Sequence, residues 1–460
     1  MSALPWSNPK PEAVTATELS YEHMKAREVD LSRLLVVYIF GGLLFMLLPG
    51  TFLGVWNLIS ISGRHAAESV SATWIQAHGH AQIFGWIGSF ILGIGWYSIP
   101  KLRGGARPYA LSMAWLTAAL WMVGVLLRWF CNVYLWEWRA LLPISAAMEL
   151  VAFLIFFRAV SQHKPEPVGG RKNGRLEAWI FVVIAGAIGL LLTLLLNFFS
   201  SFWLAFRGTR PAFPPALDQG FLVLAAWGFM VPFVWGFSAK WLPTFLGTPC
   251  ASDRRLAMAT ALLVAGVISG LSGWFRISMI AVFLASLLAV TALRIFARPE
   301  RPAKTQGIHR SFPYFLRSAY VWLLFAGALG IWAASTANAS GIWGASRHAL
   351  TVGFVSVMVF CVGQRVLPAF SGMRLLYSSK LMFLGLLLLT CGCVLRVSGE
   401  ILAYREVLHS AWSWLPYSAV LELTAVTVFA VNLVATFIHK SPMQARLTYI
   451  RNVGPRRAAN

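Results

Sequence analysis

Long apolar runs alternate with short polar segments along the whole chain. Each run has roughly twenty residues, which is the length that an α-helix needs to cross about 30 Å of hydrocarbon. We therefore predict an all-α membrane protein with twelve transmembrane helices, near residues 34–53, 75–98, 109–130, 139–159, 178–200, 219–240, 256–275, 277–297, 315–338, 344–367, 380–401 and 414–438.

Composition and charge support this prediction. Hydrophobic residues make up 58% of the 460 and charged residues only 12%, whereas about a quarter of a soluble chain is charged. The net charge of +22 suggests nucleic acid at first sight. However, 29 of the 38 Lys and Arg residues fall on one side when alternate loops are assigned to opposite sides of the membrane. Because this is the positive-inside pattern, we assign the basic side and both termini to the cytoplasm. The expected partner is the lipid bilayer and no nucleic acid.

Polar segments divide the chain into two tails and three membrane blocks. Residues 1–32 carry no apolar core behind a basic start, so we predict a cytoplasmic tail, amphipathic or disordered, without a cleavable signal peptide. Residues 440–460 form a second cytoplasmic tail, which is basic. Linkers rich in proline, glycine and basic residues, at 161–176 and 298–313, separate three predicted repeat units, at 33–160, 177–297 and 314–439.

The first and last units are versions of one four-helix sequence. At an offset of 268, residues 80–100 align with residues 348–368, and a five-residue insertion follows later. The ionisable positions paired in this way are His80 with His348, Arg128 with Arg396, and Glu149 with Glu422. In the middle unit, residues 223–243 keep the glycine and proline positions but have Val223 in place of the histidine. We predict three pseudo-repeated four-helix units, of which the middle one is degenerate.

His80 and His348 lie near the outer ends of the second and tenth predicted helices, at matching depth. Ligand-forming side chains in hydrocarbon are costly and indicate functional sites. Two neutral imidazoles on helices related by pseudosymmetry suit the two axial positions of a haem iron. Arg128 and Arg396 lie on the same side of the membrane, where they could bind the haem propionates. The alternative for each arginine is contact with lipid headgroups.

Other ionisable positions leave alternatives open. His78 lies about 200° around the helix from His80, so we expect it to face a different gap and to bind copper, a second haem or a backbone carbonyl. Glu149 and Glu422 lie in the middle of the membrane, where they form either a proton relay or hydrogen bonds between helices. The histidines of the outer loops, expected at the membrane interface or on a metal ion, are His65 and His409.

Twelve helices with histidines on helices 2 and 10 resemble the catalytic subunit of haem–copper oxidases and nitric oxide reductases, in which these histidines hold the low-spin haem. The chain is more similar to the NnrS family of haem- and copper-associated inner-membrane proteins linked to nitric oxide stress. Two motifs of that family are matched, by HGHAQIFG at 78–85 and by HALTVGF at 348–354. The resemblance implies a haem-binding protein of the bacterial inner membrane. It also implies nitric oxide or another small molecule as a partner, and metal ligands among His78, His80 and His348.

Departures from these families narrow the expected function. Oxidases hold copper with histidines on helices 6 and 7, but no histidine occurs here between His163 and His309. This argues against an oxygen-reducing centre of that type. Ala81 and Gln82 replace an acidic Glu-Met pair of the NnrS pattern, so haem is expected and copper is left open. The alternatives are a membrane transporter of haem or metal and a non-catalytic electron-transfer or assembly subunit of a respiratory haem–copper complex.

The distribution of basic residues predicts the topology. A reporter enzyme that is active only outside the cytoplasm should be inactive when fused after Asn460 and active when inserted into the 402–413 loop, which we expect to face the periplasm together with the 54–73 loop. Activity of the fusion at Asn460 would contradict the assignment.

Overall fold

The computed structural model describes residues 16–103, 110–162, 177–305, 307–337, 339–370 and 375–439. Regular structure in these residues is helical throughout, and twelve helical stretches are long and apolar enough to cross a membrane. The predicted all-α fold with twelve transmembrane helices is therefore confirmed. Residues 1–15, most of the 161–176 linker and the tail at 440–460 lie outside the described residues.

Eight spans are single α-helices. They are α5 (Leu111–Tyr134), α6 (Trp138–Ser161), α7 (Ala178–Arg207), α10 (Asp253–Leu271), α11 (Phe275–Ala292), α12 (Phe312–Ala334), α15 (Ser379–Tyr404) and α16 (Trp414–Ile438). Their lengths range from 30 residues in α7 to 19 and 18 in the neighbouring α10 and α11. Two short 3₁₀ helices lie in connecting loops, η2 (Ala67–Ser69) and η6 (His409–Ser413).

The other four spans each contain a π-helical segment, in which the turn is one residue wider than in an α-helix. They consist of α1 (Ala16–Phe45), η1 (Met46–Phe52) and α2 (Leu53–Arg64); α3 (Ala72–His80), η3 (Ala81–Gly88) and α4 (Ser89–Arg103); α8 (Pro215–Val223), η4 (Leu224–Met230) and α9 (Val231–Leu246); and α13 (Ser340–His348), η5 (Ala349–Ser356) and α14 (Val357–Phe370). Such segments are rare and frequently occur at functional sites. Three of them begin at the residue after His80, Val223 and His348. The alignment of the three sequence segments thus also aligns their π-helices.

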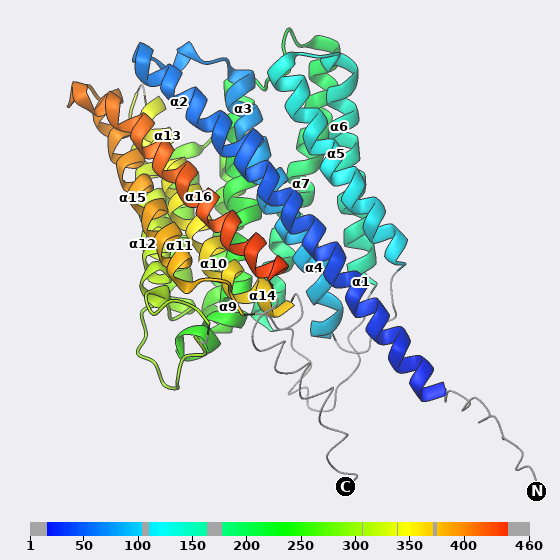
Figure 1. Ribbon diagram of the computed structural model, residues 1–460. Helices are drawn as coiled ribbons and strands as arrows, with labels where there is room; N and C mark the ends of the chain where they lie inside the picture. The colour runs from blue at the N-terminus through cyan, green and yellow to red at the C-terminus, as the bar shows by residue number, and fades with distance from the viewer. Residues whose placement is uncertain are drawn as a thin grey trace, which may run out of the picture.

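The first helix begins earlier than the sequence analysis suggested. α1 is helical from Ala16, so residues 16–32, which we assigned to a tail, continue into the first span without a break. Leu31 in this part is already buried in the core. Figure 1 shows the start of α1 projecting beyond the lower end of the bundle.

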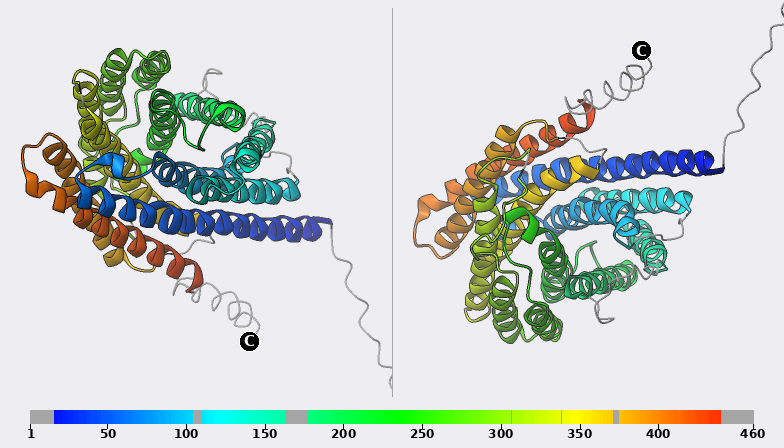
Figure 2. Two further views of the ribbon diagram at one scale, coloured as in Figure 1. Left: turned by 90° about the horizontal axis from the view of Figure 1, so that it is seen from above. Right: turned by 90° about the horizontal axis from the view of Figure 1, so that it is seen from below.

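The twelve spans form one closed bundle (Figures 1 and 2). The beginning of α1 and the end of α16 lie at the same end, as an even number of spans requires, and η2 and η6 lie at the opposite end (Figure 1). We call the end with η2 and η6 the outer end. Around the bundle, α6 packs against α7, α11 against α12, and α16 against α2, so the last four spans return to the first.

Three spans form the centre of this bundle. In Ala72–Ile99, Pro215–Leu246 and Gly341–Phe370, 72 to 78% of the membrane-crossing window is buried inside the protein, against 33 to 50% in the other nine. These central spans are the second, sixth and tenth, which are also the spans with aligned π-helices. The protein interior is therefore built around the segments that carry the paired histidines.

The backbones of α7 and of η4, in the sixth span, lie very close together where they cross. An added Cβ at Gly189 of α7 would lie 1.9 Å from the carbonyl oxygen of Gly228 in η4. Small residues allow membrane helices to pack at such short range. No side chain fits at this crossing, so glycine at position 189 is a packing requirement.

Gly189→Ala should therefore lower the stability of the purified protein by about 1–3 kcal/mol, the usual cost of forcing extra volume into a packed core. Thermal unfolding in detergent is the measurement. Gly220→Ala is the matched control, because the nearest atom to its added Cβ is 3.9 Å away, and it should leave the midpoint unchanged or raise it. Equal effects of the two variants would show that the backbone contact is not restrictive.

Candidate functional site

A cavity of about 430 Å³ lies among the three central spans. Its volume is in the range of ligand pockets, roughly 300–1,000 Å³. Apolar side chains form most of the wall. The ionisable side chains that reach it are His78, His80, Arg128, Asp218, Arg347, His348, Arg396, Glu400, Tyr404 and Glu422. All five site residues predicted from the sequence thus border one cavity.

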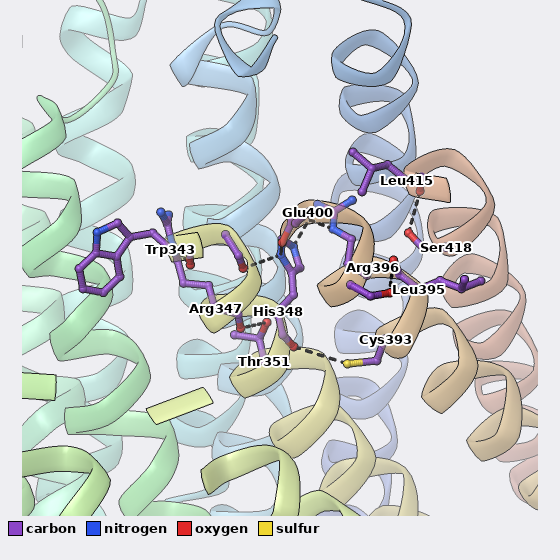
Figure 3. Close-up of polar contacts among 12 residues, drawn as sticks. Trp343, Arg347, His348, Thr351, Cys393, Leu395, Arg396, Glu400, Leu415 and Ser418 are labelled. Atoms are coloured by element: carbon purple, nitrogen blue, oxygen red, sulfur yellow. Dashed lines mark hydrogen bonds and ion pairs between the residues drawn. The ribbon is translucent and has the colours of Figure 1, made fainter. Parts of the chain in front are cut away.

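His348 is held by three groups at the end of α13 (Figure 3). Its Nδ1 lies 2.9 Å from the carbonyl oxygen of Gly344 and 3.2 Å from Oε2 of Glu400. Its Nε2 lies 3.3 Å from Nη2 of Arg396. Because a carbonyl only accepts and a guanidinium only donates hydrogen bonds, the proton belongs on Nδ1 and the lone pair on Nε2. A metal-binding histidine needs this arrangement.

Arg396 and Glu400 form the support of this histidine. They lie one turn apart on α15, with Nε of Arg396 3.1 Å from Oε1 of Glu400. Nη1 of Arg396 is buried without a hydrogen-bond partner among the described residues. A Cβ added at Gly344 would come within 3.2 Å of the Glu400 carboxylate, so the glycine leaves room for this carboxylate beside His348.

His80 has a different environment from that of His348, because its main partner is a carboxyl group on α6. Its Nε2 lies 2.7 Å from Oε1 of Glu149, a carboxyl with 0% exposure. Asn197 of α7 donates from Nδ2 to the other carboxylate oxygen of Glu149 at 3.4 Å. Phe84 lies against the imidazole, with ring centres 4.5 Å apart. His80 and Glu149 are therefore a buried acid–base pair at the edge of the cavity.

Arg128 extends this network into α7. Its Nη1 donates to Oδ1 of Asn197 at 3.2 Å and to the hydroxyl of Ser201 at 3.1 Å, and its guanidinium lies over the ring of Phe213 at 5.0 Å. Its Nε is buried without a partner among the described residues. Arg128 is 2% exposed, so this arginine points into the protein, not toward lipid headgroups.

His78 faces the first span. Its Nδ1 lies 2.9 Å from the carbonyl oxygen of Gly50 in η1, and a Cβ added at Gly54 would lie 2.7 Å from its Cε1. His348 and Arg396 border the same cavity. We expected His78 and His80 to face different gaps; their rings do bond to different helices, but both border the same cavity.

Glu149 and Glu422 occupy matching positions with different partners. A Cβ added at Gly124 would meet Cγ of Glu149 at 2.9 Å, and one added at Gly392 would meet Cγ of Glu422 at 2.8 Å. Yet Oε1 of Glu422 has no hydrogen-bond partner within the described part of the chain. In the last four spans Glu400 takes over the contact with the histidine. The first four and the last four spans thus carry the same residue types in different pairings.

Several members of the site were not predicted from the sequence. Glu400 carries a signal that could have been used, because it lies four residues after Arg396 and so on the same helix face. Asn197 and Ser201 also have helical spacing on one face of α7. The carbonyl oxygens of Gly50 and Gly344 have no sequence signal, since any residue supplies a carbonyl.

Known proteins resemble this chain in part of its sequence and in its fold. A family model described as a domain of unknown function, DUF8744, matches residues 242–438. No curated protein matches the sequence. The fold is similar to that of a haem–copper terminal oxidase dimer studied by cryo-electron microscopy, with a TM-score of 0.68 and 14% identity over 89% of this chain and 84% of that chain. The protein is therefore a multi-pass membrane protein with a fold like that of a haem–copper oxidase.

The buried hydrogen bond between His80 and Glu149 should contribute to the stability of the protein. Glu149→Leu should destabilise the protein by about 1–3 kcal/mol, because His80 and Asn197 each lose a buried acceptor. Glu149→Gln should cost less, since the amide oxygen still accepts one hydrogen bond. Thermal unfolding in detergent measures both variants.

Glu422→Leu is the matched control, because Oε1 of this residue has no partner to lose. It should be nearly neutral. A loss as large as that of Glu149→Leu would mean that the cost comes from packing beside the glycines and not from hydrogen bonds.

Proposed function

We propose that the protein binds haem in the central cavity and acts on nitric oxide in the membrane, as a protein of the NnrS type. One observation supports this above all. Histidines of the second and tenth spans border one cavity together with two buried arginines, Arg128 and Arg396, whose N–H groups are not all paired within the described part of the chain. Haem needs axial nitrogen ligands for its iron and hydrogen-bond donors for its two carboxylates.

Hydrogen bonding favours His348 and His78 as the axial ligands. In both rings Nδ1 donates to a backbone carbonyl, which orients the ring and puts the lone pair on Nε2. The Nε2 lone pair of His348 accepts a hydrogen bond from Arg396 at 3.3 Å, which, unlike a carboxylate, is a donor that iron could replace. Nε2 of His80, the ligand predicted from sequence, is instead bonded to Glu149 at 2.7 Å. We therefore propose His78 as the ligand from the second span, with His80 as the alternative that an experiment decides.

The two arginines fit the haem carboxylates. Arginine binds carboxylates through paired N–H groups, and each of these side chains has a buried nitrogen without a partner among the described residues. Nη2 of Arg396 donates to Nε2 of His348. If haem is bound, Arg396 would hold one of its carboxylates and His348 would offer Nε2 to the iron.

Bound haem would supply an iron that changes oxidation state and binds diatomic gases. The chain's own contribution lies around it. His80 and Glu149 hold a proton between Nε2 and Oε1 beside the cavity, and Asn197 orients the carboxylate. Trp86 and Leu350 are among the apolar residues of the cavity wall.

Copper is a separate question from haem. Within the described ranges, no group of three or more His, Cys, Asp or Glu side chains is arranged to hold a metal ion. The proposal for this cavity is therefore limited to haem.

A visible absorption spectrum of the purified protein, from cells supplied with haem precursor, tests the proposal. We expect a Soret band and sharp bands on reduction, as for a six-coordinate haem. His348→Ala and His78→Ala should each abolish this low-spin spectrum, whereas His80→Ala should preserve it. His309→Ala is the matched control, because its Nδ1 bonds to Ser311 at 2.7 Å, away from the cavity.

Two outcomes would change the proposal. Loss of the spectrum in His80→Ala but not in His78→Ala would restore the axial pair predicted from the sequence. A colourless preparation would contradict haem binding and favour the transporter alternative.

The proposed action on nitric oxide can be tested separately from haem binding. Membrane vesicles with the wild-type protein should remove nitric oxide, followed with an electrode, at least several-fold faster than vesicles with equal amounts of His348→Ala. Equal rates would contradict a role in nitric oxide turnover while leaving haem binding intact.

A further inference from the structure

Two histidines that are distant in the sequence meet at the outer end of the bundle, apart from the cavity. His65 directly follows α2, and His409 begins η6. Their ring centres are 4.7 Å apart and the ring planes are nearly perpendicular, at 86°. Both residues are exposed, so burial does not explain the contact.

Surrounding contacts fix the two loops that carry these rings. Trp412 stacks on His65 with ring centres 5.4 Å apart and planes at 27°. The backbone oxygen of Trp412 accepts a 2.7 Å hydrogen bond from Ser62. Beneath the rings, α2 packs on η6 and α16 through a separate apolar cluster, formed by Val55, Leu58, Ile61, Ala403, Ala411, Trp412, Leu415 and Ala419. The histidine pair is thus part of a packed unit.

The backbone of His65 is unusual. It ends α2 in the left-handed region, with φ of 53°, a conformation that residues other than glycine adopt infrequently. Glycine is the usual residue at such a helix end. Backbone outliers of this kind are often found at functional positions. Here the histidine presents an imidazole toward His409 that glycine would not supply.

We propose that His65 and His409 bind a divalent transition-metal ion at the outer surface, with Cu²⁺ preferred over Zn²⁺. Imidazole is a common ligand of both ions, and the Irving–Williams order places Cu²⁺ above Zn²⁺. A ring nitrogen bonds zinc at about 2.0–2.1 Å, and ring centres 4.7 Å apart are close enough for one nitrogen of each ring to reach a shared ion after rotation of the side chains.

The site is open. No third His, Cys, Asp or Glu of the described residues completes a metal-binding group with this pair. Water or other exchangeable ligands complete the coordination, so the ion exchanges with the surroundings. This inference does not depend on haem in the cavity.

The test is a Cu²⁺ titration of the purified, tag-free protein in detergent, followed by electron paramagnetic resonance and by quenching of tryptophan fluorescence. We expect one Cu²⁺ with two nitrogen ligands from the protein, and quenching from Trp412, which stacks on His65. His65→Gln and His409→Gln should each weaken binding at least tenfold. His309→Gln, with its own bond to Ser311, should leave binding unchanged.

Two results would overturn the proposal. One is a Cu²⁺ signal that persists at full affinity in both His65→Gln and His409→Gln, and the other is a wild-type protein that binds no Cu²⁺. Should a variant fail to fold, modification of the wild-type histidines with diethyl pyrocarbonate gives a second measurement. The modification should abolish Cu²⁺ binding, and pre-bound Cu²⁺ should protect His65 and His409 from it in peptide mapping; absence of protection would contradict the site.

Discussion

An ionisable side chain inside a membrane needs a partner, because hydrocarbon offers neither water nor counterions. At its histidines and arginines the cavity meets this requirement with contacts that cross between helices, whereas Oε1 of Glu422 has no partner in the described part of the chain. His80 bonds to Glu149, which joins the second span to α6, and His348 bonds to Glu400, which joins α13 to α15. Arg128 donates to α7. Each chemically useful group therefore also holds two helices in register, and removal of one partner leaves the other uncompensated.

Much of the fold could be predicted from the sequence, since the length and apolar character of each span are local properties. Every predicted span overlaps a helix of the structure, and the alternation of basic and non-basic loops supported the count of twelve. The π-helical segments were not predicted, because a widened turn leaves no mark in the periodicity of a uniformly apolar run. The helical start of the chain at Ala16 was missed for a related reason, as its residues are polar and helix formation there follows from continuity with the first span.

At the site, the sequence identified which residues take part, but it could not show which side chains form hydrogen bonds with each other. The offset of the repeats found His80, His348, Arg128 and Arg396, and all of them border one cavity. Which ring nitrogen faces which neighbour depends on helix rotation and on carbonyl groups that any sequence supplies. The contact between Nδ1 of His78 and Gly50 could only be seen in three dimensions. Paired positions in repeated units, such as Glu149 and Glu422, also need not keep the same partners.

The unequal lengths of the spans have a consequence for the surrounding lipid. α7 has 30 residues, whereas its neighbour α10 has 19 and α11, which packs on α10, has 18. At 1.5 Å per residue these lengths correspond to about 45 Å for α7 and about 28 Å for the short pair. A bilayer whose hydrocarbon core is about 30 Å thick accommodates the long helix through tilt and the short pair through local thinning. The face formed by α10 and α11 should therefore gather lipids with shorter or more disordered acyl chains, and the protein should prefer thinner regions of its membrane.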